Sequence, residues 1–229
     1  TDAQGLRYRY GHQPQIAHWN LAQLGSAILP LIEDIEPLQA ALNVYPTAYE
    51  QHHQAMMMDK LGLSTFDPDI DNDLIADLFA VLRAVETDMT RFYRNLANID
   101  AESQHQKRDE AHIAPLADAY YSPDEHTPAH RAQIGKWLRA YIQRVQKEGT
   151  SNDTRKRKMN AVNPRYVLRN YLAQLAIDKA EAGDPSGVTE LLDVLRRPYD
   201  DQPGREAFAE KRPEWARHRA GCSMLSCSS

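Results

Sequence analysis

The side chains with the clearest capacity for covalent chemistry are two cysteine thiols close to the end of the sequence. Cys222 and Cys227 are the only cysteines among 229 residues. A thiolate attacks disulfides, so two thiols on an exposed, mobile tail can pair with each other or with a cysteine elsewhere. A Cys222–Cys227 bridge closes a tight loop, which disulfide geometry permits. Composition alone favours two incidental cysteines in a reducing compartment, because two thiols are too few for the disulfide framework of a secreted protein.

Two histidine pairs and one acidic run have spacings that suggest cation binding. His52 and His53 are adjacent, whereas His126 and His130 lie four residues apart, on one face of a helix. Zinc needs a third or fourth ligand and no cysteine lies near either pair, so exposed polar residues explain the histidines better. The alternating aspartates from Asp67 to Asp73 lack the central glycine and closing glutamate of a calcium loop, and they are interpreted as helix-capping surface. The sequence therefore predicts no metal site.

Charge and hydropathy limit the partners of the chain. The basic run Arg155–Lys158 could dock a phosphate-rich partner, but Asp153 precedes it and the net charge is −5, so a solvated helix face is the favoured interpretation. This balance gives no general attraction to nucleic acid or anionic lipid, and no run of eighteen apolar residues predicts a membrane span. In the run Met56–Met58, one or two side chains are expected in the core, although an adaptable binding surface is an alternative. No glycine-rich phosphate loop or nucleophile elbow occurs, so no catalytic or cofactor-binding residue is predicted here.

Helical periodicity covers the first hundred residues. Apolar spacing predicts a helix over 13–33, with Trp19 in its core stripe, and a second over 37–61 that Pro46 either kinks or splits. Asp71 or Asn72 is the expected N-cap of a third helix, and Asp88 that of a short fourth one.

Periodicity is lost over 100–127, where Ser, Gln, Asp, His and Pro accumulate, so a long loop and the best internal boundary are expected there. Three further helices are expected. The first ends at Gly149, the second starts at Pro164 with Asn163 as its cap and Leu168 in the core, and the third lies around Leu191–Leu195.

The expected fold class is all-α. The sequence predicts a helical bundle with no sheet strand and an irregular tail over 199–229 that Phe208 and Trp215 hold to the surface. The expected divisions are 1–99, 100–127, 128–198 and 199–229. Because the chain starts at Thr1 without an initiator Met or signal peptide, an internal cut is expected.

Five sequence blocks resemble the C-terminal half of the selenoprotein O family. They are Tyr8–Leu24, Asn163–Ala173, Leu195–Tyr199, Arg212–Ala216 and the ending Ser226–Ser229. The resemblance implies that the division 1–99 continues a kinase-like C-lobe and that 100–127 is an insertion. It also implies a pseudokinase fold that transfers AMP from ATP to Ser, Thr or Tyr hydroxyls of protein substrates, with Mg²⁺ or Mn²⁺ on the phosphates.

By the same resemblance, the catalytic, nucleotide-binding and metal-binding residues precede Thr1, so these 229 residues alone are expected to be inactive and to bind no cofactor. The remaining partner would be the N-terminal, kinase-like part of the same protein. Cys227 matches the third-from-last position, which is selenocysteine or cysteine in the family, and is the implied redox residue. Its disulfide partner is either Cys222 or a cysteine upstream. The family's location implies the cytoplasm for a bacterial member and the mitochondrion for a eukaryotic one. The alternative hypothesis is a non-enzymatic helical interaction module.

Overall fold

The computed structural model describes residues 9–102, 109–122 and 126–222, and these ranges are helical with no sheet strand. The predicted all-α class is therefore confirmed. An isolated antiparallel bridge joins Thr87 to Tyr120. The chain divides into two compact units, with the boundary after Met56.

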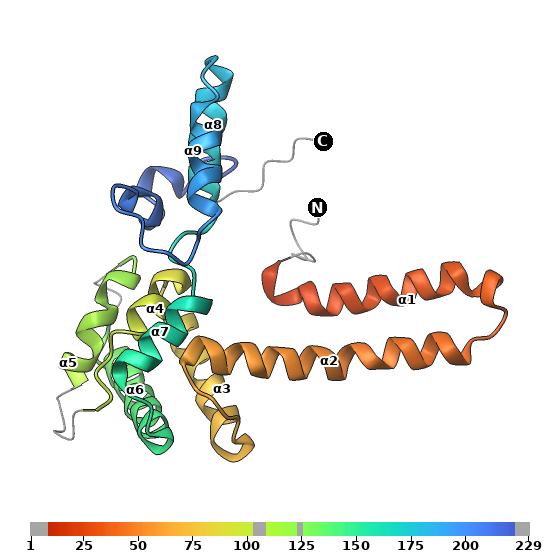
Figure 1. Ribbon diagram of the computed structural model, residues 1–229, viewed down its shortest axis with the longest axis horizontal. Helices are drawn as coiled ribbons and strands as arrows, with labels where there is room; N and C mark the ends of the chain where they lie inside the picture. The colour runs from red at the N-terminus through yellow and green to blue at the C-terminus, as the bar shows by residue number, and fades with distance from the viewer. Residues whose placement is uncertain (1–8, 103–108, 123–125, 223–229) are drawn as a thin grey trace. The chain divides into compact units, whose positions relative to one another are not determined.

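The first unit is a hairpin of long helices, which Figure 1 shows side by side. A short turn, η1 (Tyr10–His12), leads into α1 (Gln13–Ile32), and α2 (Glu36–Leu61) follows. The Tyr45 hydroxyl donates to the Pro14 carbonyl at 3.0 Å, and the Tyr45 ring stacks on His18. Both predicted helices are confirmed, and Pro46 lies inside α2 without splitting it.

The first unit lacks a buried interior of its own. No residue of α1 is buried, and Trp19, which periodicity placed in a core, is 47% exposed. The buried residues of α2 are Met57, Met58 and Leu61, all beyond the boundary of this unit. The expectation of one or two core methionines in the run Met56–Met58 is thus confirmed.

The second unit contains the main core. It is formed by the end of α2 with α3 (Pro68–Ala84), α4 (Met89–Leu96), α5 (Asp109–Ile113), η2 (Ala114–Ala119), α6 (Pro128–Glu148) and α7 (Asn152–Val162). Trp137 lies at its centre, donates its indole N–H to the Leu74 carbonyl at 2.9 Å and stacks on Tyr141. The described part of the expected loop 100–127 contains α5 and η2, and Leu116 and Ala119 of η2 are buried.

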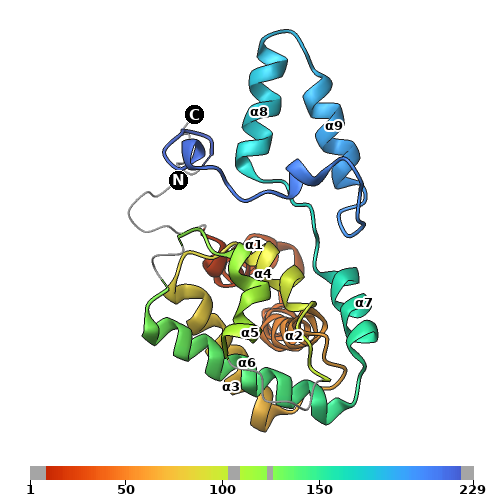
Figure 2. The same ribbon diagram turned by 90° about the vertical axis from the view of Figure 1, so that its left-hand side faces the viewer.

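A smaller apolar cluster joins α8 (Asn170–Glu181) and α9 (Ser186–Leu195), which lie side by side in Figure 2, to the C-terminal segment. That segment carries two short turns, η4 (Glu206–Ala209) and η5 (Glu214–Ala216). Phe208 packs against this cluster, and Trp215 meets Tyr171 edge to face, as expected for residues that hold the tail.

The helix ends test the predicted caps. Asp88 accepts from the Arg91 N–H at 3.1 Å and Gly149 ends α6 at φ +69°, so both predictions are confirmed. The N-cap of α3 is Asp67, and the prediction of Asp71 or Asn72 is wrong by one turn, because Pro68 already opens the helix.

The predicted helix start at Pro164 is also wrong, because α8 begins at Asn170. The amides of Arg165 and Tyr166 both donate to the Pro198 carbonyl, at 2.8 and 3.1 Å. These long-range hydrogen bonds hold the segment outside a helix, and Leu168 within it is 61% exposed.

Candidate functional site

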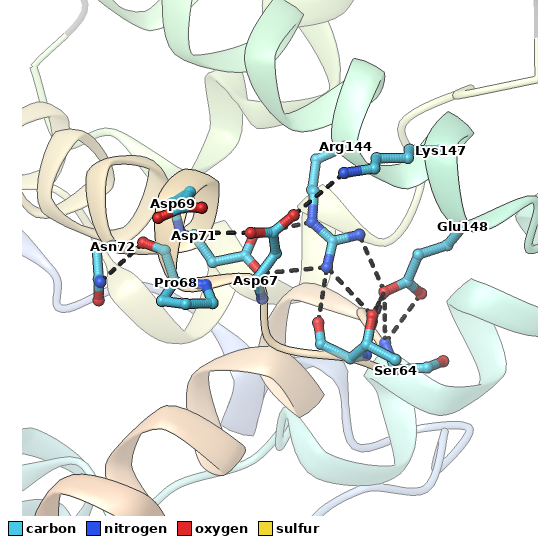
Figure 3. Close-up of polar contacts among 10 residues, drawn as sticks. Ser64, Asp67, Pro68, Asp69, Asp71, Asn72, Arg144, Lys147 and Glu148 are labelled. Atoms are coloured by element: carbon cyan, nitrogen blue, oxygen red, sulfur yellow. Dashed lines mark hydrogen bonds and ion pairs between the residues drawn. The ribbon is translucent and has the colours of Figure 1, made fainter.

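The acidic run at the start of α3 forms a buried ion-pair cluster with α6 (Figure 3). Arg144 donates from Nε to Asp71 Oδ1 at 2.8 Å and from Nη2 to Oδ2 at 3.1 Å. Both side chains are buried, and Asp71 Oδ2 also accepts from the Asp67 N–H at 2.7 Å. The interpretation of the whole run as capping surface is therefore wrong for Asp71, since its carboxylate neutralises a cation from another helix.

Glu148 extends this cluster at the C-terminal end of α6. Its carboxylate accepts from the N–H groups of Ser64 and Thr65 and from Arg144 Nη1 at 3.1 Å. Burial acts against the charged form, but these hydrogen bonds and the Arg144 charge outweigh it and lower the pKa of Glu148.

Asp67 lies at the exposed edge of the cluster, caps α3 and accepts a hydrogen bond from Lys147 at 3.1 Å. This hydrogen bond is the main reason that the pKa of Asp67 is lowered. Ammonium, guanidinium and N–H donors thus surround these carboxylates, which suits a structural clamp better than a calcium site.

The basic run Arg155–Lys158 forms the predicted solvated face at its last three residues, which are exposed, but the prediction is wrong for Arg155. Arg155 is fully buried, and its guanidinium donates to the Leu96 carbonyl, the Ile99 carbonyl and the Tyr141 hydroxyl. Leu96 ends α4, where carbonyls lack helical partners and the helix dipole favours a cation. A faint signal was available in the sequence, because apolar Met159 lies one turn from Arg155 on the same face.

The histidine pairs form aromatic contacts. His130 is buried, and its ring lies edge to face with His126, at a centroid distance of 5.0 Å, and with Tyr120. Burial, and then the neighbouring His126, lower the pKa of His130. His53 stacks on Tyr49. The described ranges contain no group of three or more His, Cys, Asp or Glu side chains able to hold a metal ion.

The two thiols differ in what the structure describes. Cys222 is buried in the smaller cluster with Tyr171, Leu172 and Ala216, so the expectation that it lies on an exposed, mobile tail is wrong. Cys227, the predicted redox residue, lies outside the described residues. Its pairing with Cys222 or with an upstream cysteine stays a prediction.

A groove of about 420 Å³ lies beside Cys222's cluster, between α8, α9 and the C-terminal segment. Its walls are mainly apolar and aromatic, with Leu175, Phe208 and Trp215 among them, and Lys179 and Glu190 are among its charged lining residues. Concave apolar surfaces with a few polar groups are typical of ligand or peptide sites. Sequence reasoning missed this groove, because its walls come from segments that lie far apart in the chain.

Comparison with known proteins identifies the family. The family model described as protein adenylyltransferase SelO matches residues 1–196. The chain belongs to the SelO family. It is 52% identical over its whole length to the protein nucleotidyltransferase YdiU of Rhodopirellula baltica and 51% identical to that of Aromatoleum aromaticum. The matched region is 44% and 42% of those two proteins, so this SelO chain spans less than half the length of its curated relatives.

The geometry of this SelO segment defines what the described residues can do. The Asp71 and Arg155 clusters fix helix ends, and the groove presents a mainly apolar surface. None of them presents the paired carboxylates and phosphate-binding backbone that ATP and a divalent ion need, so these residues do not fit the cofactors that the family implies. No helix of the described ranges is long and apolar enough to cross a membrane.

Proposed function

We propose that this chain is the C-terminal helical portion of a protein adenylyltransferase that transfers AMP from ATP to Ser, Thr or Tyr hydroxyls of protein substrates. The single observation that carries the proposal is the match of the whole chain, at about half identity, to less than half of each nucleotidyltransferase relative. The whole protein would supply ATP binding and catalysis from the part that precedes this chain. These 229 residues would complete a kinase-like C-lobe.

The uncovered apolar surface of the α1–α2 hairpin supports a role as part of a larger protein. Leu24 and Leu31 on α1 and Val44 on α2 are each more than half exposed, and α1 has no buried residue. An exposed apolar face of this extent is typical of a surface that a further part of the protein covers. The preceding, nucleotide-binding part of the same polypeptide is the proposed cover.

The cofactors of the proposed reaction are ATP with Mg²⁺ or Mn²⁺, held by the preceding part. The contribution of this chain would be to shape the surface that receives the protein substrate and to carry Cys227 as a regulatory redox residue. We place the bacterial protein in the cytoplasm, where a thiol is reduced by default and becomes oxidised as a signal.

Mass spectrometry of proteins incubated with ATP and Mg²⁺ or Mn²⁺ tests the proposal. AMP adducts, a phosphodiester-linked adenosine on Ser, Thr or Tyr, are expected with the full-length protein and are not expected with the 229-residue chain. A matched reaction with the full-length protein and no divalent ion controls for carried-over adducts. Adducts formed by the 229-residue chain alone would contradict the division of labour.

The groove beside α8 and α9 favours one second candidate, a non-enzymatic helical module that binds other proteins. Its walls combine aromatic and aliphatic side chains with a few charged ones, as protein interfaces do. The absence of AMP adducts with the full-length protein, in the presence of either ion, would favour this module over the adenylyltransferase.

A further inference from the structure

The segment 209–217, which we call the C-terminal strap, lies between two surfaces of the second unit. On one side it meets the smaller apolar cluster, where its Ala216 is fully buried and the Tyr171 hydroxyl of α8 donates to the Glu210 carbonyl at 3.0 Å. On the other side it meets the main core, yet among the described residues the apolar interior of that core includes none from the strap. The strap is therefore held to α8 and α9 largely by apolar contacts, and to the main core by polar ones.

Glu86, which lies just after α3, holds two arginines of the strap with one carboxylate. Its Oε1 accepts from Arg212 Nη2 at 2.7 Å, and its Oε2 accepts from Arg217 Nη2 at 2.8 Å. Burial acts against the charged form of Glu86, but the hydrogen bonds and charges of the two arginines outweigh it and lower the pKa of Glu86. The removal of this single charge would leave both arginines without their carboxylate on the main core.

Further hydrogen bonds cross the same boundary without joining opposite charges. They run from Arg91 to the Ala209 carbonyl, from Lys211 to the Tyr120 carbonyl, and from the Arg212 N–H to the Tyr121 hydroxyl. The last of them, at 3.2 Å, involves a backbone amide of the strap and a side chain of the main core. Protection of the Arg212 amide from hydrogen exchange therefore reports directly on whether the strap lies on the core.

The ion pairs at Glu86 are partly open to solvent. The side chains of Glu86, Arg212 and Arg217 are 35%, 24% and 32% exposed. Salt screens partly exposed pairs much more than buried ones, and such pairs contribute little each. Segments with few buried apolar contacts and solvent-exposed hydrogen bonds open locally at a lower free energy than the core. The core-facing side of the strap has both properties, so the strap is expected to detach before the core unfolds.

We propose that the C-terminal strap is a releasable cover whose closed state depends on the Glu86 carboxylate. When the pairs at Glu86 break, the strap leaves the edge of the main core and withdraws Ala216 from the smaller apolar cluster. The main core stays folded during this opening. The thiol of Cys222, which is 6% exposed in the same cluster, then becomes accessible to solvent. The device thus links the ionic conditions at Glu86 to the exposure of an interior surface, and it does not depend on AMP transfer.

Hydrogen exchange of the full-length protein, followed by mass spectrometry of its peptides, tests the proposal. Glu86→Gln is expected to raise the exchange rate of the strap amides about tenfold, because two partly exposed ion pairs are lost. A tenfold change corresponds to about 1.4 kcal/mol of opening free energy. Amides around Trp137 in α6 are expected to keep their rate. Alkylation of Cys222 by iodoacetamide, measured on its own peptide, is expected to rise by the same factor as strap exchange, because the same opening exposes the thiol.

A matched variant and a salt series separate release from a general effect of charge. Glu214→Gln removes a carboxylate that pairs with the same Arg217 at 3.2 Å, but Glu214 lies within the strap and is 80% exposed. This variant is expected to leave strap exchange unchanged. Raising the salt concentration from about 0.1 M to about 1 M shortens the screening length from about 10 Å to about 3 Å. It is expected to speed strap exchange in the wild type and in Glu214→Gln, and to have little further effect in Glu86→Gln.

Three results would overturn the inference. The first is strap exchange that Glu86→Gln leaves unchanged, or that salt accelerates equally in this variant and in the wild type. The second is a parallel rise in the strap and in α6, because it would mean that the unit unfolds as a whole. The third is faster strap exchange with no change in Cys222 alkylation, because the strap would then not cover the cluster.

Discussion

Replacing Arg144 with leucine tests whether the buried cluster between α3 and α6 stabilises the fold through its charges. The substitution removes both hydrogen bonds to Asp71 and leaves a fully buried carboxylate without its cation. Removing one partner of a buried ion pair costs about 3 to 5 kcal/mol of unfolding free energy, because the remaining charge loses its compensation. The Thr65 carbonyl also loses its 2.6 Å donor. Such a loss is a large part of the 5 to 15 kcal/mol that stabilises an ordinary domain.

The assay is urea denaturation of the 229-residue chain, followed by circular dichroism. Arg139→Leu is the matched control, because it removes an arginine from the same helix whose side chain is 53% exposed beside Asp109. An exposed pair of this kind contributes at most about 1 kcal/mol. The double variant Asp71→Leu with Arg144→Leu removes the unpaired charge at Asp71, while Glu148 loses Arg144 in both variants and keeps its hydrogen bonds from the Ser64 and Thr65 N–H groups. It is therefore expected to unfold less easily than Arg144→Leu alone. The reasoning would be refuted if Arg144→Leu and Arg139→Leu lowered the free energy of unfolding equally. It would also be refuted if the double variant lost as much free energy of unfolding as its two single variants together.

Three further predictions concern other parts of the second unit. The pKa of Asp184 is lowered to about 2 by hydrogen bonds from the Ser186 side chain, the Ser186 backbone and Lys179, in that order of size. Ser186→Ala is therefore expected to raise that pKa toward 3.8 in a carboxyl NMR titration. Leu78→Ala is expected to cost about 2 to 5 kcal/mol because Leu78 is fully buried, whereas Leu168→Ala changes the free energy of unfolding by less than about 0.5 kcal/mol in the same denaturation assay. The pKa of Glu148 is lower in the folded state, so the stabilising effect of its carboxylate is fully present above its ordinary pKa of 4.5. That effect is lost as the pH falls through the lower folded value. Glu148→Gln is therefore expected to make the free energy of unfolding depend less on pH in this acidic range.

Those features of the fold that depend on neighbours in the sequence could be predicted. Helical periodicity located α1, α2, α6 and α9, and local capping chemistry located Asp88 and Gly149. Helix length and cap position follow from residues within one or two turns, which a single sequence displays. Pro46 remained ambiguous because a proline inside a helix either bends it or ends it, and the packing around it decides which.

Features that depend on distant partners could not be predicted. Asn163-Pro164 has the composition of a helix start, yet the Asn163 amide donates to the Lys60 carbonyl at 2.9 Å, 103 residues away. Cys222 looked exposed because a terminal segment rich in serine gives no periodic signal, whereas an apolar cluster from α8 and α9 covers it. In both cases the competing contact comes from a segment that no local pattern indicates.

Buried arginines show most clearly why the candidate sites were misread. Composition assigns charged residues to the surface, because burying a charge is unfavourable unless partners replace its water. Arg144 meets a carboxylate, and Arg155 meets carbonyls at the end of α4, so both find such partners inside the fold. The two arginines differ in the group that their removal would leave unpaired. Losing Arg144 leaves an unpaired anion at Asp71, whereas losing Arg155 leaves neutral carbonyls, which carry a smaller penalty when buried alone. Asp71 in the acidic run and Arg155 in the basic run are therefore better understood as two ways of ending and joining helices than as parts of binding sites for cations and phosphates.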